Sequence, residues 1–145
     1  MAAGRPQVDA QNEREEEPAD RSAETRRRIL LADDHRVVRE ALRLLIEGRG
    51  FEVVAEASDG REAIQLAQRL RPDIAVLDLA MPLVNGIEAA REIRGNSAPS
   101  SILMLTGSNS RADVDRARSA GAAGYVTKDR IAAELIDAIV EIAER

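Results

Sequence analysis

Residues 74–86, Ile-Ala-Val-Leu-Asp-Leu-Ala-Met-Pro-Leu-Val-Asn-Gly, decide how this chain folds. Four apolar residues run directly into Asp78, and a turn that contains Pro82 follows before a helical pattern begins. A short, uncharged run rich in branched side chains is typical of a strand that is buried on both faces of a parallel sheet. The stretch therefore predicts a buried strand that brings one carboxylate to the edge of the sheet.

Four further apolar runs of this kind occur from residue 28 onward. They are Ile29–Ala32, Val53–Ala55, Ile102–Leu105 and Tyr125–Val126. The second run is weaker and its flanks alternate between apolar and polar residues, which favours an edge strand. The runs start about 22 to 28 residues apart, which is the length of a strand–helix unit. We therefore expect five strands, with the strand at residues 74–77 in the centre.

The segments between the runs have the period of amphipathic helices. The positions expected to face the core are Val37, Val38, Ala41, Leu42 and Leu45, then Ala63, Ile64, Ala67 and Leu70, then Ile87, Ala90 and Ile93, and finally Leu135, Ile136, Ile139 and Val140. The helix at about 111–120 is mostly Ala, Arg and Ser, so we expect it to be the most loosely held. Five such units predict an α/β fold, a doubly wound parallel sheet with helices on both faces.

The composition bounds the domain organisation and the classes of function. The length of 145 residues fits one domain, and residues 1–27 carry charge runs and two prolines with little to bury, which predicts a disordered charged leader before a domain at 28–145. A partner-binding arm is the alternative for this leader. The net charge of −5 argues against a general nucleic-acid binder. The absence of cysteine excludes disulfides and thiolate metal sites, and it fits a reducing, cytoplasmic location.

Membrane insertion and secretion are not expected either. No stretch approaches the roughly 20 consecutive apolar residues that a membrane span needs. Residues 1–28 contain no apolar run of the kind found in a secretory signal. We therefore expect no membrane partner.

Polar groups follow four of the five predicted strands. Asp33 and Asp34 follow the first, Asp78 the third, Thr106 ends the fourth, and Lys128 follows the fifth. In an open parallel sheet these carboxyl ends share one edge, where ligands bind. Taken singly, each residue has a plain structural explanation, such as a helix cap at Asp34 or a solvated charge at Lys128. Only their joint placement favours a functional site.

Three neighbouring carboxylates repel one another unless they are protonated or neutralised. Mg²⁺ would solve this problem, because it prefers oxygen ligands and keeps several waters. Lys128, the single lysine of the chain, would supply a positive charge to a phosphate oxygen, and Thr106 would donate a hydrogen bond to another. The central position of its strand makes Asp78 the expected nucleophile. His35, beside the acidic pair, is assigned no metal role.

Four segments in order resemble the motifs of response-regulator receiver domains in two-component signalling. They are Arg28–His35, Asp78–Gly86, Leu105–Thr106 and Gly124–Asp129. The resemblance extends over about residues 28–145, and the last segment is most similar to receivers of LuxR-type regulators. It implies a flavodoxin-like (βα)5 fold with strand order 2-1-3-4-5.

The resemblance also implies residue roles. Asp78 would accept a phosphoryl group from a phosphohistidine on a sensor histidine kinase or phosphotransfer protein. Asp34 would ligate Mg²⁺ directly, Asp33 mainly through water, and the Asp78 carboxylate and the backbone carbonyl of Ala80 would complete the protein ligands. The chain would then catalyse only its own phosphorylation and dephosphorylation and would not be an enzyme in the ordinary sense.

The resemblance further implies a switch. Thr106 and Lys128 would contact the phosphoryl oxygens, Thr106 would move toward the phosphate, and Tyr125 would turn inward. This would rearrange the surface of the fourth helix, fifth strand and fifth helix for a downstream protein partner, with homodimerisation on phosphorylation as a further expectation. One departure is Asp129, where many receivers have a proline joined to the lysine by a cis bond.

Four alternative functions follow from the same residues. A phosphohydrolase of the haloacid dehalogenase type needs a second aspartate two residues after the nucleophile, where this chain has Ala80. A nucleotide- or flavin-binding module would need a Gly-rich loop after the first strand. A receiver-like adaptor would have lost an acidic or lysine position. The last alternative is the receiver part of a DNA-binding regulator, since no helix-turn-helix precedes Arg145 and direct nucleic-acid binding by this chain is not expected.

Overall fold

The computed structural model describes residues 26–96, 100–107 and 110–145. Almost all of the leader predicted at residues 1–27 lies outside these residues. Strands and helices alternate along the described chain, as the spacing of the apolar runs predicts. The elements are β1 (Arg28–Ala32), α2 (Arg36–Glu47), β2 (Glu52–Ala57), α3 (Gly60–Leu70), β3 (Ile74–Asp78), α4 (Gly86–Gly95), β4 (Ser101–Thr106), α5 (Arg111–Ser119), β5 (Ala122–Thr127), a 3-10 turn (Lys128–Arg130) and α6 (Ile131–Ala143).

The five strands form one parallel sheet in the order β2-β1-β3-β4-β5. The predicted doubly wound topology is thus confirmed, with β3 in the centre and the weaker β2 at an edge. Every residue of β3 is buried, because helices cover both faces of the sheet. The register pairs Asp78 with Leu105 and Thr106 with Thr127, so these strands end at the same edge.

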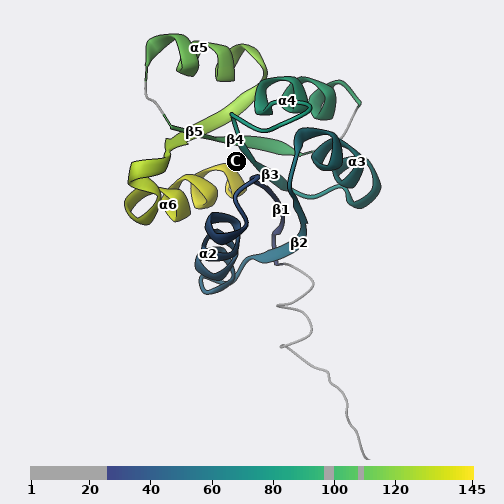
Figure 1. Ribbon diagram of the computed structural model, residues 1–145. Helices are drawn as coiled ribbons and strands as arrows, with labels where there is room; N and C mark the ends of the chain where they lie inside the picture. Colours follow the sequence, from purple (N-terminus) through teal and green to yellow (C-terminus); the bar gives the residue numbers. More distant parts are fainter. Residues whose placement is uncertain (1–25, 97–99, 108–109) are drawn as a thin grey trace, which may run out of the picture.

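The helices divide between the two faces of the sheet and make two cores (Figure 1). Small alanines dominate the core under α3, α4 and α5, whereas longer aliphatic side chains fill the core under α2 and α6. Helix α5 buries only Ala117, which agrees with the expectation that it has the least apolar surface to bury. Little therefore holds α5 against the sheet apart from its contacts with β5.

The buried face of α2 differs from the expectation. Val37 is 79% exposed and Val38 is 36% exposed, and the helix is anchored instead by Leu42 and Ile46. Val37 shares one stripe of the helix with Ala41 and Leu44, which are also exposed. The apolar period predicted the helix correctly, but the expectation that Val37, Val38 and Ala41 face the core is wrong, because the helix is buried through the side that carries Leu42 and Ile46.

Side-chain caps fix the starts of three helices. Asp59 accepts a hydrogen bond from the Glu62 N–H at the start of α3, and Asn85 and Glu88 form a reciprocal capping box at the start of α4. The Ser110 side chain accepts a hydrogen bond from the Asp113 N–H at the start of α5. Helix α2 begins after His35 without a side-chain cap, so Asp34 does not act as the helix cap that was one explanation for it.

Gly60 joins α3 to the loop that follows β3. A Cβ atom at Gly60 would lie 1.8 Å from the backbone oxygen of Val84 and 2.9 Å from the Val84 Cβ. Only a glycine therefore lets the start of α3 contact the segment between Asp78 and α4. This close approach fixes the position of the loop that carries the edge of the site.

Replacing Gly60 with alanine should lower the free energy of unfolding by about 2 to 3 kcal/mol, because the new methyl group overlaps a backbone atom that cannot move freely. Gly95→Ala is the matched control, since a Cβ there meets nothing within 4 Å and removing a helical glycine should stabilise by up to about 1 kcal/mol. Urea unfolding monitored by circular dichroism measures both changes. Equal stability of Gly60→Ala and the original chain would contradict this packing.

Candidate functional site

Three carboxylates meet at the carboxyl edge of the sheet. Asp33 and Asp34 directly follow β1 and Asp78 ends β3, and together with His35 they offer ligand atoms that all lie within 4.8 Å of one another. Asp33 and Asp78 are buried, with 0% and 2% of their surface exposed, whereas Asp34 and His35 face the solvent. The site thus has a buried acidic floor and an open, polar rim.

Lys128 reaches the two buried carboxylates from the turn after β5, the strand at one edge of the sheet. Its Nζ donates a hydrogen bond to Oδ2 of Asp78 at 3.0 Å and lies 3.3 Å from Oδ2 of Asp33. The lysine opens the 3-10 turn after β5, and its peptide bond to Asp129 is trans, like every other described peptide bond. One ammonium group therefore contacts two buried carboxylates, Asp78 and Asp33, which precede it by 50 and 95 residues in the sequence.

The electrostatics of the site follow from this sharing. Burial raises the pKa of the Asp78 carboxyl, the hydrogen bond and charge of Lys128 offset part of that rise, and the charge of Asp33 adds to it. Burial lowers the pKa of Lys128, but the hydrogen bond to Asp78 and the charges of Asp78 and Asp33 outweigh it and leave the pKa raised. The raised pKa keeps the Lys128 ammonium charged beside the two buried carboxyl groups.

The donor set fits a hard divalent cation. Among the described residues, Oδ2 of Asp33 is the buried side-chain oxygen without a well-aligned hydrogen bond, and its neighbour at 3.3 Å is the Lys128 ammonium that already donates to Asp78. One ammonium group shared by two buried carboxylates compensates for only part of the cost of burying them, and a second cation would offset more of it. Carboxylate oxygens that converge on one point are the ligands that Mg²⁺ prefers, so the residues at this edge match the predicted metal.

The loop after β3 is tied to β4 directly after Asp78 and is closed by a hydrogen bond at its far end. The Leu79 N–H donates to the Leu105 carbonyl at 2.8 Å, and the Gly86 N–H donates to the Leu79 carbonyl at 2.8 Å. The Ala80 N–H donates to Oδ1 of Asp78 at 3.3 Å, while Lys128 holds the other oxygen. The Asp78 carboxylate is therefore oriented by one backbone donor and one charged donor.

Two residues to which the sequence assigned no role in the site also lie in it. His35 donates its backbone N–H to Oδ1 of Asp33 at 2.8 Å, and its Nδ1 lies 3.2 Å from Oδ1 of Asp34. Arg39, one turn into α2, donates to the backbone carbonyl of Asp33 at 2.7 Å. The adjacency of His35 to the acidic pair was visible in the sequence, but nothing distinguishes Arg39 from the many other arginines of the chain.

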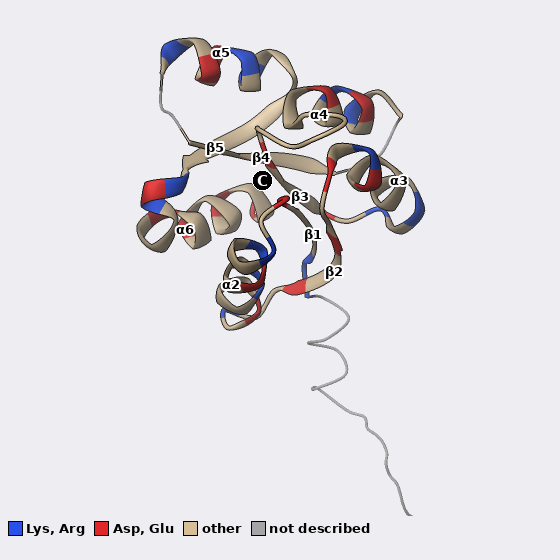
Figure 2. Cartoon of the chain, in the orientation of Figure 1, with Lys and Arg blue, Asp and Glu red and all other residues tan. Residues whose placement is uncertain are grey.

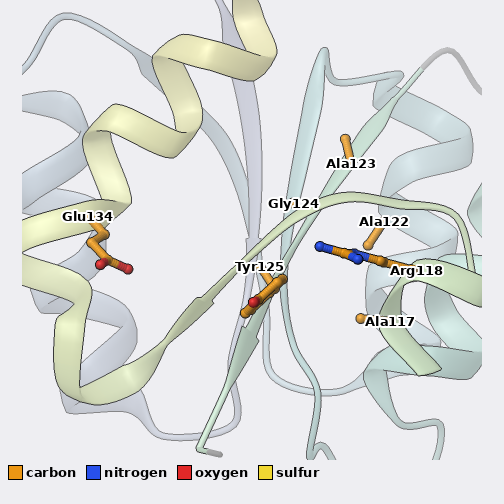
Figure 3. A pocket seen from close by; sticks show the side chains of 7 residues that line it. All are labelled: Ala117, Arg118, Ala122, Ala123, Gly124, Tyr125 and Glu134. Carbon is orange, nitrogen blue, oxygen red and sulfur yellow. The ribbon is translucent and has the colours of Figure 1, made fainter. Parts of the chain in front are cut away.

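Thr106 and Tyr125 occupy the neighbouring strands β4 and β5. Thr106 is buried at the end of β4, one step past Leu105, the partner of Asp78. Tyr125 is half-buried and lines a hollow of about 330 Å³ between α5, β5 and α6. Alanine and glycine residues line much of this hollow, and Figure 3 shows Arg118 reaching toward Tyr125, with Glu134 on the opposite side. The guanidinium carbon of Arg118 lies 6.0 Å from the centre of the Tyr125 ring.

Charged residues lie mainly on the helices and near the ends of strands, while β4 and β5 contain none (Figure 2). No helix in the described part of the chain is both long and apolar enough to cross a membrane.

This combination of fold and site defines a signalling receiver. Residues 29–140 match the family model of the response regulator receiver domain, and the chain belongs to that family. The resemblance to two-component receivers is thereby confirmed.

Individual relatives place the chain more closely. The transcriptional regulatory protein PdtaR of Mycobacterium tuberculosis is 41% identical over 121 residues, which cover 83% of this chain and 58% of that protein. A LuxR-family two-component response regulator from Aurantimonas is 47% identical in its crystal structure, with a TM-score of 0.79, covering 83% of this chain and 86% of that one. The receiver domain of the putative response regulator NarL from Mycobacterium tuberculosis is 32% identical, with a TM-score of 0.78, and covers 82% of this chain and 97% of that one. The likeness to LuxR-type receivers is thus confirmed, and the chain spans little more than half the length of the curated relatives it matches.

The raised pKa of Asp78 predicts how stability depends on pH in the metal-free protein. Because the native state binds the Asp78 proton more tightly than the unfolded chain does, the contribution of this group to the free energy of unfolding falls as pH rises through the unfolded and then the folded pKa. Asp78→Asn removes that penalty. In EDTA the variant should be more stable than the original chain at pH 7, with a smaller difference near pH 4. Urea titrations at both pH values measure this, and a variant that is less stable at pH 7 would contradict it.

Proposed function

We propose that the Asp78 carboxylate accepts a phosphoryl group from a phosphohistidine on a sensor histidine kinase or a phosphotransfer protein, in a reaction that requires Mg²⁺. The observation that carries this proposal is the contact of one ammonium group, Lys128, with two buried carboxylates, Asp78 and Asp33. A structural ion pair would need only one acid, and the surplus acid calls for a cation. Membership of the receiver family supports the same function.

The metal would be held by the carboxylates of Asp33, Asp34 and Asp78 and by the backbone carbonyl of Ala80. Mg²⁺ bound there supplies positive charge that neutralises the acidic cluster and the incoming phosphate. Asp34 is the exposed member of the cluster and would be the direct ligand, while the buried Asp33 would act mainly through water. Both follow β1, so the end of that strand sets their separation from Asp78.

In the transfer itself, an oxygen of Asp78 attacks phosphorus as the bond from phosphorus to the histidine nitrogen breaks. The electron pair of that bond stays on the imidazole, and the product is an acyl phosphate. Lys128 stays near Asp78 and pairs with a phosphoryl oxygen, and the Thr106 hydroxyl donates to another. Hydrolysis by water later restores Asp78, so the chain modifies itself and turns over no separate substrate.

The signal would leave the site through β4 and β5. Movement of Thr106 toward the phosphate frees space at the end of β4, and Tyr125 on the neighbouring strand turns inward to fill it. The weakly anchored α5 can follow, because it buries only Ala117. The surface of α5, β5 and α6 would then bind a downstream protein, with a second copy of the chain as one such partner.

The bounds of the receiver, its cellular location and its output belong to the same proposal. We place the receiver at residues 28–145 and in the cytoplasm, where sensor kinases deliver their phosphoryl groups. Relatives of this chain are transcriptional regulators about twice as long as the matching segment. We therefore propose that phosphorylation controls an output step in transcription, through a domain or partner that this receiver contacts.

Incubating the chain with Mg²⁺ and a small phosphodonor such as phosphoramidate should add one phosphoryl group, as measured by intact-mass spectrometry. Asp78→Asn should abolish the adduct, because the nucleophile is gone, and EDTA should reduce its formation at least tenfold. Asp137→Asn, an exposed aspartate of α6, is the matched control and should be phosphorylated normally. An adduct that persists in Asp78→Asn, or continuous consumption of donor without an adduct, would refute the assignment and favour a hydrolase.

Mg²⁺ alone should stabilise the protein by binding the native acidic cluster. At a concentration about 100 times the dissociation constant, the free energy of unfolding should rise by about 2.7 kcal/mol. Asp33→Asn should remove most of this gain, because it takes away a buried carboxylate whose charge Lys128 shares with Asp78 and does not fully compensate. Thermal unfolding with and without MgCl₂ measures the effect, and an equal gain in the variant would show that the ion binds elsewhere.

A further inference from the structure

Arg39 makes an unusual pair of contacts behind the acidic cluster. Its Nη1 donates to the backbone carbonyl of Asp33 at 2.7 Å, and its Nε donates to Oε1 of Glu56 on β2 at 3.0 Å. The side chain is only 17% exposed. One planar guanidinium thus connects α2, β2 and the turn that carries both acidic residues.

The Asp33 carbonyl has a special place in that turn. Strand β1 ends at Ala32 and α2 begins at Arg36, so the carbonyl lies between two regular elements. The Asp33 N–H still bonds to the Ala57 carbonyl of β2 at 3.0 Å. Because a peptide unit is planar, the direction of the Asp33 carbonyl also sets the direction of the Asp34 N–H and its Cα. Whatever holds this carbonyl therefore orients both acidic side chains.

We propose that Arg39 is a positioning residue for the metal site, acting through the peptide between Asp33 and Asp34. This inference rests on the proposed Mg²⁺-dependent function. The arginine fixes the peptide plane from behind, so that the two carboxylates are already aimed at the cation before it binds. Glu56 holds the guanidinium in place and neutralises its charge, with Arg43 pairing to the other oxygen of Glu56 at 3.1 Å.

The sign of the effect separates this role from simple electrostatics. A positive charge beside an acidic cluster repels a cation, so charge alone predicts that removing Arg39 tightens Mg²⁺ binding. A positioning role predicts the opposite, because the carboxylates would lose their preset orientation. Lysine keeps the charge but lacks the fork that reaches two acceptors in different directions.

The test is calorimetric titration of the full chain with MgCl₂, comparing the original protein with Arg39→Gln and Arg39→Lys. We expect the dissociation constant to rise about tenfold in Arg39→Gln, as is typical for loss of a group that orients a metal ligand, and severalfold in Arg39→Lys. Arg43→Gln is the matched control. It removes the same charge from the same carboxylate, but the contacts of Arg43 run to Glu56 and Glu47, so its dissociation constant should stay within about twofold.

A second measurement uses the metal-free protein. Amide hydrogen exchange at His35, whose N–H donates to Asp33, should speed up in both Arg39 variants, while exchange in β3 and β4 stays unchanged and shows that the fold is intact. Equal or tighter Mg²⁺ binding in Arg39→Gln would overturn the inference, as would equal losses in Arg39→Gln and Arg43→Gln. Failure of the original chain to bind Mg²⁺ would overturn the proposed function together with this inference.

Discussion

A single ammonium group shared by two buried carboxylates organises the carboxyl edge of this sheet. Burying Asp33 and Asp78 side by side is costly, and Lys128 compensates for only one unit of their charge. The remaining charge is what makes the edge suited to a divalent cation and, with it, to a phosphate.

The sheet makes this arrangement possible because it brings together residues that are far apart in the sequence. Parallel pairing of β1, β3 and β4 aligns their carboxyl ends, and the turn after β5 adds the lysine from the side. The apolar runs predicted the strands of the parallel sheet, the polar residues after them predicted the shared edge, and the resemblance to receiver domains implied the strand order. The edge position of β2 followed from the polar and apolar alternation at its flanks.

Sequence reasoning was less reliable where tertiary placement decides burial. It assigned Val37, Val38 and Ala41 to the core, although all three are exposed and the helix is buried through Leu42 and Ile46. It identified the polar residues at strand ends, but not Arg39, because a side chain that reaches back to a carbonyl six residues earlier leaves no trace in composition or period. The strand ends themselves were predictable because parallel topology fixes where they meet, whereas the direction of a side chain on α2 depends on packing.

The central claim is the contact between the ammonium of Lys128 and the carboxylate of Asp78, and the chain offers a direct probe because it contains one lysine. Labelling with ¹⁵N-lysine gives a single side-chain Nζ resonance in the nuclear magnetic resonance spectrum. The account predicts that this signal titrates at a pKa above the ordinary lysine value and that Asp78→Asn lowers this pKa. A signal that titrates as a free lysine and is indifferent to Asp78→Asn would contradict it.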